Sequence, residues 1–288
     1  MELKKELTLI DVFSVATGAM ISSGLFILPG LAHAIAGPAV ILSYMLAGIV
    51  ALAGVMSVAE LATAMPRAGG DYFFIARGLG SQAGTVAGLL SWFSLSLKSA
   101  FALIGMAAFA SLFTSIDMRL IASLLAVIFT LLNIVGIKEA GRVQVVLVIG
   151  LVFLLGFYIV KGIPHVSLTR LEPFSPNGAM AVIATSGFVF ISYGGLLKVV
   201  SIAEEIKNPG RNIPLGMILS LLVVSVLYTL SVLVTTGVME RGELNTSLTP
   251  ISDGAYLFLG TAGKVVMSVA AVLAFISTAN AGLMSASR

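Results

Sequence analysis

Long apolar segments alternate with short polar loops along almost the whole chain. Each of eight segments is close to or above the roughly 20 residues that a helix needs to cross a membrane. They occupy residues 9–35, 38–64, 82–113, 118–137, 143–160, 179–206, 213–238 and 261–286. The loops between them contain glycine and proline, which end helices, as at Gly37-Pro38. The pattern predicts an all-α polytopic membrane protein with about eight transmembrane helices, in a single transmembrane domain over residues 1–288.

Composition supports the membrane class and excludes several functions. Hydrophobic residues make up 58% of the chain and charged residues 10%, against roughly 25% charged in soluble proteins. The sequence has no cysteine, no His, Asp and Glu cluster with metal-ligand spacing, and no paired nucleophile and base. It therefore predicts no metal, no cofactor, no catalytic residues and no enzyme activity. His33 and His165 fall near predicted membrane edges and are interpreted as exposed loop residues.

The basic residues predict the orientation of the chain in the membrane. They are spread over loops between apolar segments, which favours a topology signal over a nucleic-acid surface. An even number of spans places both ends on one side, where nine basic residues lie: Lys4, Lys5, Arg67, Arg77, Lys138, Arg142, Lys207, Arg211 and Arg288. The opposite side has five: Arg119, Lys161, Arg170, Arg241 and Lys264. The excess predicts a multi-pass protein of the cell membrane with a cytoplasmic N-terminus.

The first apolar segment contains residues that are unfavourable in the middle of a continuous helix. Gly18, Ser22, Ser23 and Gly24 lie within the sequence GAMISSGLF, residues 18–26. Glycine adds backbone freedom, and serine hydroxyls compete for backbone hydrogen bonds. An opened helix would expose N–H and C=O groups, which a membrane tolerates only beside protein or a watery cavity. The alternative is an unbroken helix whose small residues let a neighbouring helix approach closely.

The sixth apolar segment has a similar interruption. The paired glycines Gly194 and Gly195 follow Ser192 and Tyr193 in the middle of this segment. Interruptions five segments apart are typical of an inverted repeat, whose interface would bring the two together. The first repeat would cover about residues 9–160, and an incomplete second repeat about 179–288. The polar stretch that follows, residues 203–214, is interpreted as a solvated loop that sets topology.

Lys98 is a charged residue near the centre of the third apolar segment. A charge at that depth costs roughly 2.5–3.5 kcal/mol even on the lenient insertion scale, so the side chain should face the bundle interior. It could act as a counter-charge for an anionic group, or as an amine that loads and releases a proton. The structural alternatives are a misplaced segment boundary or a lysine that only hydrogen-bonds nearby serines.

Several short motifs together resemble a known family. They are residues 18–26, Glu60 with PRAGGDY at 66–72, SYGG at 192–195, EEIKNP at 204–209, RNIP at 211–214 and STAN at 277–280. In this arrangement the chain resembles the amino acid-polyamine-organocation (APC) superfamily of secondary transporters, in its amino acid permease branch. The resemblance covers nearly the whole chain, and EEIKNP is its most specific motif.

The resemblance implies a LeuT-type inverted-repeat helical bundle in which helices 1 and 6 are broken. It implies that Ser22, Ser23 and Gly24 bind the carboxylate of an amino acid. The ammonium would meet carbonyl groups at Ala19, Met20, Ile191, Ser192, Tyr193 and Gly194, with Tyr193 helping to close the pocket. In relatives that use sodium, hydroxyls on helix 8 contribute to an ion site, and Ser277 and Thr278 stand at those positions.

Three departures from the family limit what carries over. Gly194 and Leu197 replace acidic residues that many relatives have around the sixth-helix break, which disfavours a cationic substrate. The fifth segment lacks the lysine of some proton-coupled relatives, and Lys98 is the candidate to replace it. Relatives usually continue beyond an eighth helix, so we expect either a fragment or a partner that supplies the missing helices.

The sequence thus predicts a secondary active transporter, a symporter that moves neutral or anionic amino acids by alternating access. Its coupling ion would be a proton, with Lys98 as the candidate carrier, or sodium, with Ser277 and Thr278 as candidate ligands. The alternative is a non-transporting or incomplete membrane component of the same fold: a fragment, a subunit or an amino acid sensor.

Overall fold

A computed structural model describes residues 4–67, 70–110, 116–135 and 137–286 of the chain. The longer helices, most of which match the predicted apolar segments, are α1 (Leu9–Met20), α3 (Leu28–Ala36), α4 (Val40–Ala64), α5 (Gly70–Leu79), α6 (Ser81–Ala110), α7 (Met118–Val135), α8 (Ile137–Gly162), α9 (Gly178–Val189), α11 (Pro209–Val238) and α13 (Pro250–Ala286). Shorter helices are α2 (Ser23–Phe26), α10 (Leu197–Ser201) and α12 (Arg241–Thr246). The described residues form no sheet, so the all-α prediction is confirmed.

Membrane-length helices account for most of the fold. Six helical segments are long and apolar enough to cross a membrane: Leu28–Ala64, Ser81–Ala107, Ala140–His165, Gly178–Ser201, Pro209–Val238 and Pro250–Ala286. Two apolar helices are shorter, Leu9–Met20 and Met118–Leu131. The chain is therefore a polytopic helical bundle, as the apolar pattern predicts. The division into two inverted repeats stays a prediction.

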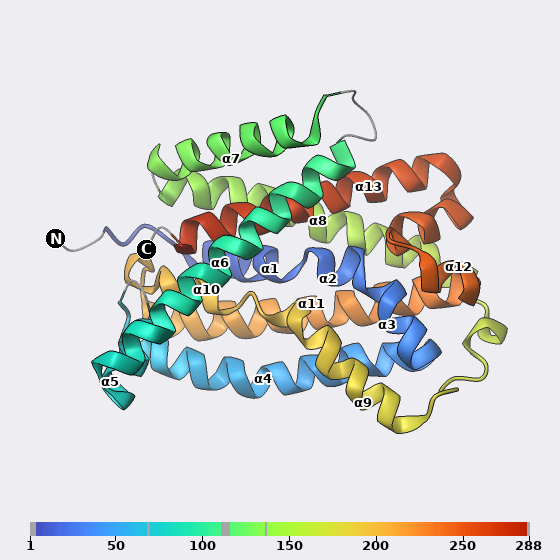
Figure 1. Ribbon diagram of the computed structural model, residues 1–288, viewed down its shortest axis with the longest axis horizontal. Helices are drawn as coiled ribbons and strands as arrows, with labels where there is room; N and C mark the ends of the chain where they lie inside the picture. Colours follow the sequence, from blue (N-terminus) through green and yellow to red (C-terminus); the bar gives the residue numbers. More distant parts are fainter. Residues whose placement is uncertain (1–3, 68–69, 111–115, 136, 287–288) are drawn as a thin grey trace.

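Helix α1 lies in the middle of the bundle. Figure 1 shows α4 and α11 on one side of it and α8 and α13 on the other, while α6 crosses the bundle diagonally. The start of α1 and the end of α13 lie at the same end of the bundle. Every residue from Ser14 to Met20 is buried. Small side chains in this stretch let the surrounding helices approach α1 closely.

The first apolar segment opens within its glycine and serine stretch. Helix α1 ends at Met20, Ile21 is extended with φ −74° and ψ 105°, and Ser22 has φ −157° and ψ −137°. The short helix α2 then begins at Ser23. A second opening interrupts the sixth segment, where α9 ends at Val189 before a 3₁₀ turn. The α-helical ladder is therefore interrupted by an extended residue at the first position and by a 3₁₀ turn followed by glycines at the second.

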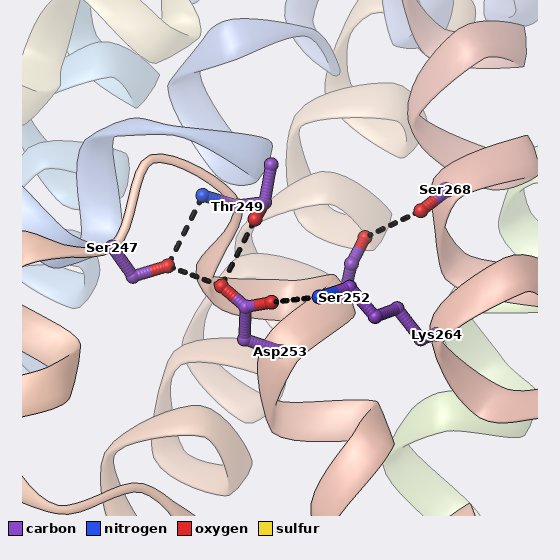
Figure 2. A network of polar contacts seen from close by, with 6 residues as sticks. All are labelled: Ser247, Thr249, Ser252, Asp253, Lys264 and Ser268. Carbon is purple, nitrogen blue, oxygen red and sulfur yellow. Dashed lines mark hydrogen bonds and ion pairs between the residues drawn. The ribbon is translucent and has the colours of Figure 1, made fainter. Parts of the chain in front are cut away.

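Helix α13 bends back on itself before the predicted eighth segment. Gly260, at φ 64° and ψ −155°, supplies a left-handed conformation that glycine adopts without steric cost. Across the bend, Lys264 Nζ lies 3.1 Å from Asp253 Oδ1 (Figure 2). The hydroxyls of Ser247 and Thr249 donate to Asp253 Oδ2 over 2.7 and 2.9 Å. This network joins the chain before α13 to both arms of the bend.

One prediction about exposed polar residues is wrong, and another holds only in part. His33 has only 3% of its surface exposed, and its Nδ1 lies 2.7 Å from the side-chain oxygen of Asn245 on α12. The predicted solvated loop is exposed at Lys207, Asn208 and Arg211 but packed at its start, where Glu205 is 3% exposed. Its carbonyl oxygen accepts the amides of Glu6 and Leu7 over 2.9 and 3.0 Å. Both burials arise from chain segments distant in sequence, which no local pattern indicates.

We predict that Gly195→Ala destabilises the fold. A β-carbon at Gly195 would lie 2.3 Å from the carbonyl carbon of Ala19 and 2.7 Å from the amide nitrogen of Met20. Backbone atoms in a packed core move little, so overpacking should cost about 1–3 kcal/mol. The melting temperature of the purified protein in detergent should fall.

Gly187→Ala is the matched control, since a β-carbon there meets nothing within 4 Å. Alanine is the better helix former by about 1 kcal/mol, so this variant should melt at the same temperature or higher. Equal melting temperatures for the two variants would contradict the close contact between the two openings.

Candidate functional site

A cavity of about 570 Å³ lies between the two helix openings and is also bordered by residues of α6 and α13. Its size is within the range of roughly 300–1,000 Å³ typical of small-molecule sites. It is lined by Ser22, Ser23, Gly24, Ile27, Leu28, Ser94, Leu97, Lys98, Ala102, Gly105, Ile191, Ser192, Gly194, Phe275 and Thr278. Mostly apolar walls with a few polar groups are the usual character of such a site.

Most of the binding residues expected from the sequence meet at this cavity. Those that line it are Ser22, Ser23, Gly24, Lys98, Ile191, Ser192, Gly194 and Thr278. Four others lie outside the lining: Ala19, Met20, Tyr193 and Ser277, each no more than 2% exposed. The structure therefore brings together residues from α2, α6, α13 and the sixth-segment opening. The four other residues are buried outside the cavity lining.

Backbone N–H groups at the first opening, in residues that line the cavity, have no partner among the described residues. Ser22, Ser23 and Gly24 stand at the start of α2, where the first amides of a helix have no intrahelical acceptor. No acceptor among the described residues takes up these amide hydrogens, and Ser22 makes no side-chain cap. Unpaired amides that line a cavity favour a ligand with negative charge.

Two tyrosines hold carbonyl groups that the openings release, and a third, Tyr193, joins the second opening to α4. Tyr44 OH donates to Gly24 O over 2.7 Å, and Tyr228 OH donates to Met20 O over 2.8 Å and to Ser192 O over 3.3 Å. Tyr193 OH donates to Tyr44 O over 3.0 Å. The rings meet edge to face, with centroids 5.7 Å apart for Tyr44 and Tyr228 and 5.3 Å apart for Tyr193 and Tyr228. This cluster secures both openings at once.

The roles of Tyr44 and Tyr228 were missed in the sequence. Both lie inside long apolar segments, where a tyrosine is compatible with ordinary core packing. Their polar ends need a partner when buried, and each side chain is fully buried. A tyrosine in the middle of a span is the signal that could have indicated them.

Thr278 on α13 closes the first opening from the other side. Its hydroxyl is 2.9 Å from Gly18 O and 3.3 Å from Ile21 O, which it approaches as a donor. Its own carbonyl accepts Lys198 Nζ over 3.1 Å. Thr278 therefore connects α1 and α13 at the edge of the cavity.

Ser277 belongs to a separate buried network. Gln144 Nε2 on α8 donates to Ser277 Oγ over 2.7 Å and to Ser14 O over 3.3 Å. Gln144 Oε1 accepts from Asn280 Nδ2 over 2.9 Å. The predicted sodium ligand Ser277 is thus occupied by an amide from the fifth apolar segment, which the sequence did not indicate.

Two lysines lie on this side of the bundle without a carboxylate partner. Lys98 is partly buried and lines the cavity, whereas Lys198 on α10 is completely buried. Among the described residues, neither amine has an Asp or Glu oxygen within the 4.0 Å of an ion pair. The described residues also contain no group of three His, Asp or Glu that could hold a metal ion. The sequence drew attention to Lys98 and missed Lys198.

Comparison with known families agrees with this architecture. The profile of a family described as "Amino acid permease" matches residues 7–288. The chain belongs to this amino acid permease family. It is a multi-pass membrane protein of the APC superfamily, and the resemblance carried by its sequence motifs is confirmed.

Curated relatives of this permease differ in what their names say they carry. A methylthioribose transporter of Bacillus subtilis is 31% identical over 296 residues, covering 94% of this chain and 63% of the relative. A branched-chain amino acid permease of the same organism is 30% identical, covering 91% and 60%. Cationic amino acid transporter 1 of Arabidopsis thaliana is 32% identical, covering 80% and 42%. The permease thus spans less than two thirds of the length of these relatives.

We predict that Tyr228→Phe lowers stability, because it leaves the buried carbonyls of Met20 and Ser192 without this donor. An unsatisfied buried polar group costs about 1–3 kcal/mol. The melting temperature in detergent should fall relative to wild type. Tyr256→Phe is the matched control, since Tyr256 is 52% exposed, and it should leave the melting temperature unchanged. Equal melting temperatures for the two variants would show that the cluster does not hold the openings.

Proposed function

We propose that this permease carries an amino acid, neutral or anionic, across the cell membrane by alternating access. The observation that carries the proposal is the cavity between two openings in the first and sixth apolar segments. Freed backbone at membrane depth is tolerated where it lines such a cavity, and it provides hydrogen-bonding groups for a polar cargo. Family membership supports amino acid transport as the general activity.

The α-carboxylate would bind at the free amides and hydroxyls of Ser22, Ser23 and Gly24. The ammonium would bind near the carbonyl groups of the second opening, where Ile191 and Gly194 line the cavity. The carbonyl of Met20, also expected from the sequence, already accepts the Tyr228 hydroxyl. It would take part only after a rearrangement of the two openings, such as the rocking motion of alternating access.

The excess of basic residues at one end supports a cytoplasmic N-terminus for this permease. Amino acids from outside would then reach the cavity from the end of the bundle that holds the bend of α13.

Gly24→Leu should abolish accumulation of the substrate in proteoliposomes. A β-carbon at Gly24 would lie 2.5 Å from Ser192 Cβ and 2.9 Å from Ser192 Cα, so a leucine would force the openings apart and fill the site. Uptake of a mixture of labelled amino acids measures the effect. Gly54→Leu is the control, because nothing lies within 4 Å of its β-carbon. Uptake that survives Gly24→Leu would place the site elsewhere, and no uptake by wild type would contradict transport by this chain.

We propose the proton as the coupling ion and Lys98 as its carrier. Lys98 lines the cavity and has no carboxylate partner among the described residues, so its charge state acts directly on the site. The sodium alternative has less support, because Ser277 accepts the Gln144 amide and the Thr278 hydroxyl contacts two carbonyls of α1. Ser277 also lies outside the residues that line the cavity.

Lys98→Ala should remove the dependence of uptake on an inward proton gradient, because the titrating amine is gone. Initial uptake rates at matched external pH values, with and without the gradient, provide the measurement. Lys161→Ala removes an exposed lysine at the end of α8 and should keep the wild-type response. A pH profile that Lys98→Ala leaves intact would exclude Lys98 as the carrier, and uptake that requires sodium would favour Thr278 and Ser277 instead.

A further inference from the structure

The cavity has an unbalanced charge. Lys98 is the only charged side chain among the described residues that line it. The remaining polar lining consists of hydroxyls and backbone groups, which carry no net charge. An ammonium group in a mostly apolar pocket is costly unless an anion pairs with it. The protein supplies no such anion within ion-pair distance in the part of the chain that the structure describes.

Lys198 supplies a second amine, which is buried next to a residue of the cavity lining. Its side chain is completely buried and donates to the carbonyl of Thr278, a lining residue. A β-carbon at Gly282 would lie 3.0 Å from Lys198 Nζ and 1.7 Å from the hydroxyl of Ser99. Ser99, the neighbour of Lys98 on α6, therefore lies close to the Lys198 amine. The fold thus places two basic groups near the site and no described acidic group against it.

The geometry points to an acidic amino acid as the substrate, with its side-chain carboxylate paired with Lys98. This inference rests on the proposed function and narrows it to one charge class. An amino acid with two carboxylates and one ammonium has a net charge of about −1 at neutral pH. One carboxylate would bind the free amides at Ser23 and Gly24, and the second would bind the ammonium of Lys98. The substrate then completes the ion pair that the protein leaves open.

Other amino acid classes leave the charge of the cavity unbalanced. A neutral amino acid brings one carboxylate and one ammonium, so Lys98 keeps an unpaired charge. A cationic amino acid adds a further like charge, which is unfavourable in a desolvated site. If Lys98 also carries the coupling proton, its charged form is the one that binds, so substrate and proton load at one amine.

The decisive experiment compares ligands that differ only in charge. Purified permease in lipid nanodiscs is titrated at pH 7 with L-glutamate and L-glutamine, and with L-aspartate and L-asparagine. Binding is measured by isothermal titration calorimetry, with L-leucine and L-lysine as additional probes. At least one acidic ligand should bind about tenfold or more tightly than its amide, as expected for a charge-assisted pair against a neutral contact.

Two variants of Lys98 test whether this residue causes the preference for the acidic ligand. Lys98→Met keeps the length and apolar stem of the side chain and should reduce the preference for the acidic ligand to about twofold or less. Lys98→Arg keeps the charge and should retain a preference for the acidic ligand. Lys161→Met makes the same substitution at an exposed site outside the cavity and should behave as wild type. Melting temperatures of all variants show that each one folds.

The outcomes distinguish failure of the acidic-substrate inference from failure of the proposed function. Discrimination that disappears only in Lys98→Met supports the inference. Equal binding of glutamate and glutamine, tighter binding of leucine or lysine, or discrimination that survives Lys98→Met would overturn it while leaving amino acid binding intact. If folded wild-type protein binds none of the six amino acids, the proposed function fails together with this inference.

Discussion

The structure depends on one constraint: backbone groups released at membrane depth must find partners inside the protein, because the lipid offers none. Two apolar segments open near each other, and each opening releases carbonyl and amide groups. The hydroxyls of Tyr44, Tyr228 and Thr278 take up carbonyls of the first opening, and Tyr228 also reaches the second. Amides at Ser23 and Gly24 find no acceptor in the part of the chain that the structure describes. The carbonyls are thus used for structure, and the amides remain for a ligand.

Close packing of backbone against backbone makes this arrangement possible. Gly195 approaches Ala19, and Gly24 approaches Ser192, at distances that exclude any side chain. The two openings therefore share one wall, and any movement that separates them must also break tyrosine hydrogen bonds. A carrier that exposes its site alternately to two sides needs such a joint, since rigid helices on either side can rotate about it.

The position of two lysines depends on a similar constraint. Lys98 and Lys198 lie within membrane-length helices and have no carboxylate partner among the described residues. Buried charges without a partner are rare in membranes and mark functional positions. Here they lie beside a cavity whose other described lining residues are uncharged, so under the proposed function the balancing charge comes from the substrate.

The sequence by itself determined the helical membrane class, the position of each apolar segment and the opening at residues 18–26, because hydrophobic length and glycine and serine content act locally. It also determined the family, and it indicated Lys98, since a charge inside an apolar segment is visible without a structure. Only the tertiary structure decided which groups meet. The contacts of Tyr228 with Met20, of Gln144 with Ser277 and of Lys198 with Thr278 join positions far apart in the chain. Such contacts depend on how the helices pack, and no local pattern records them.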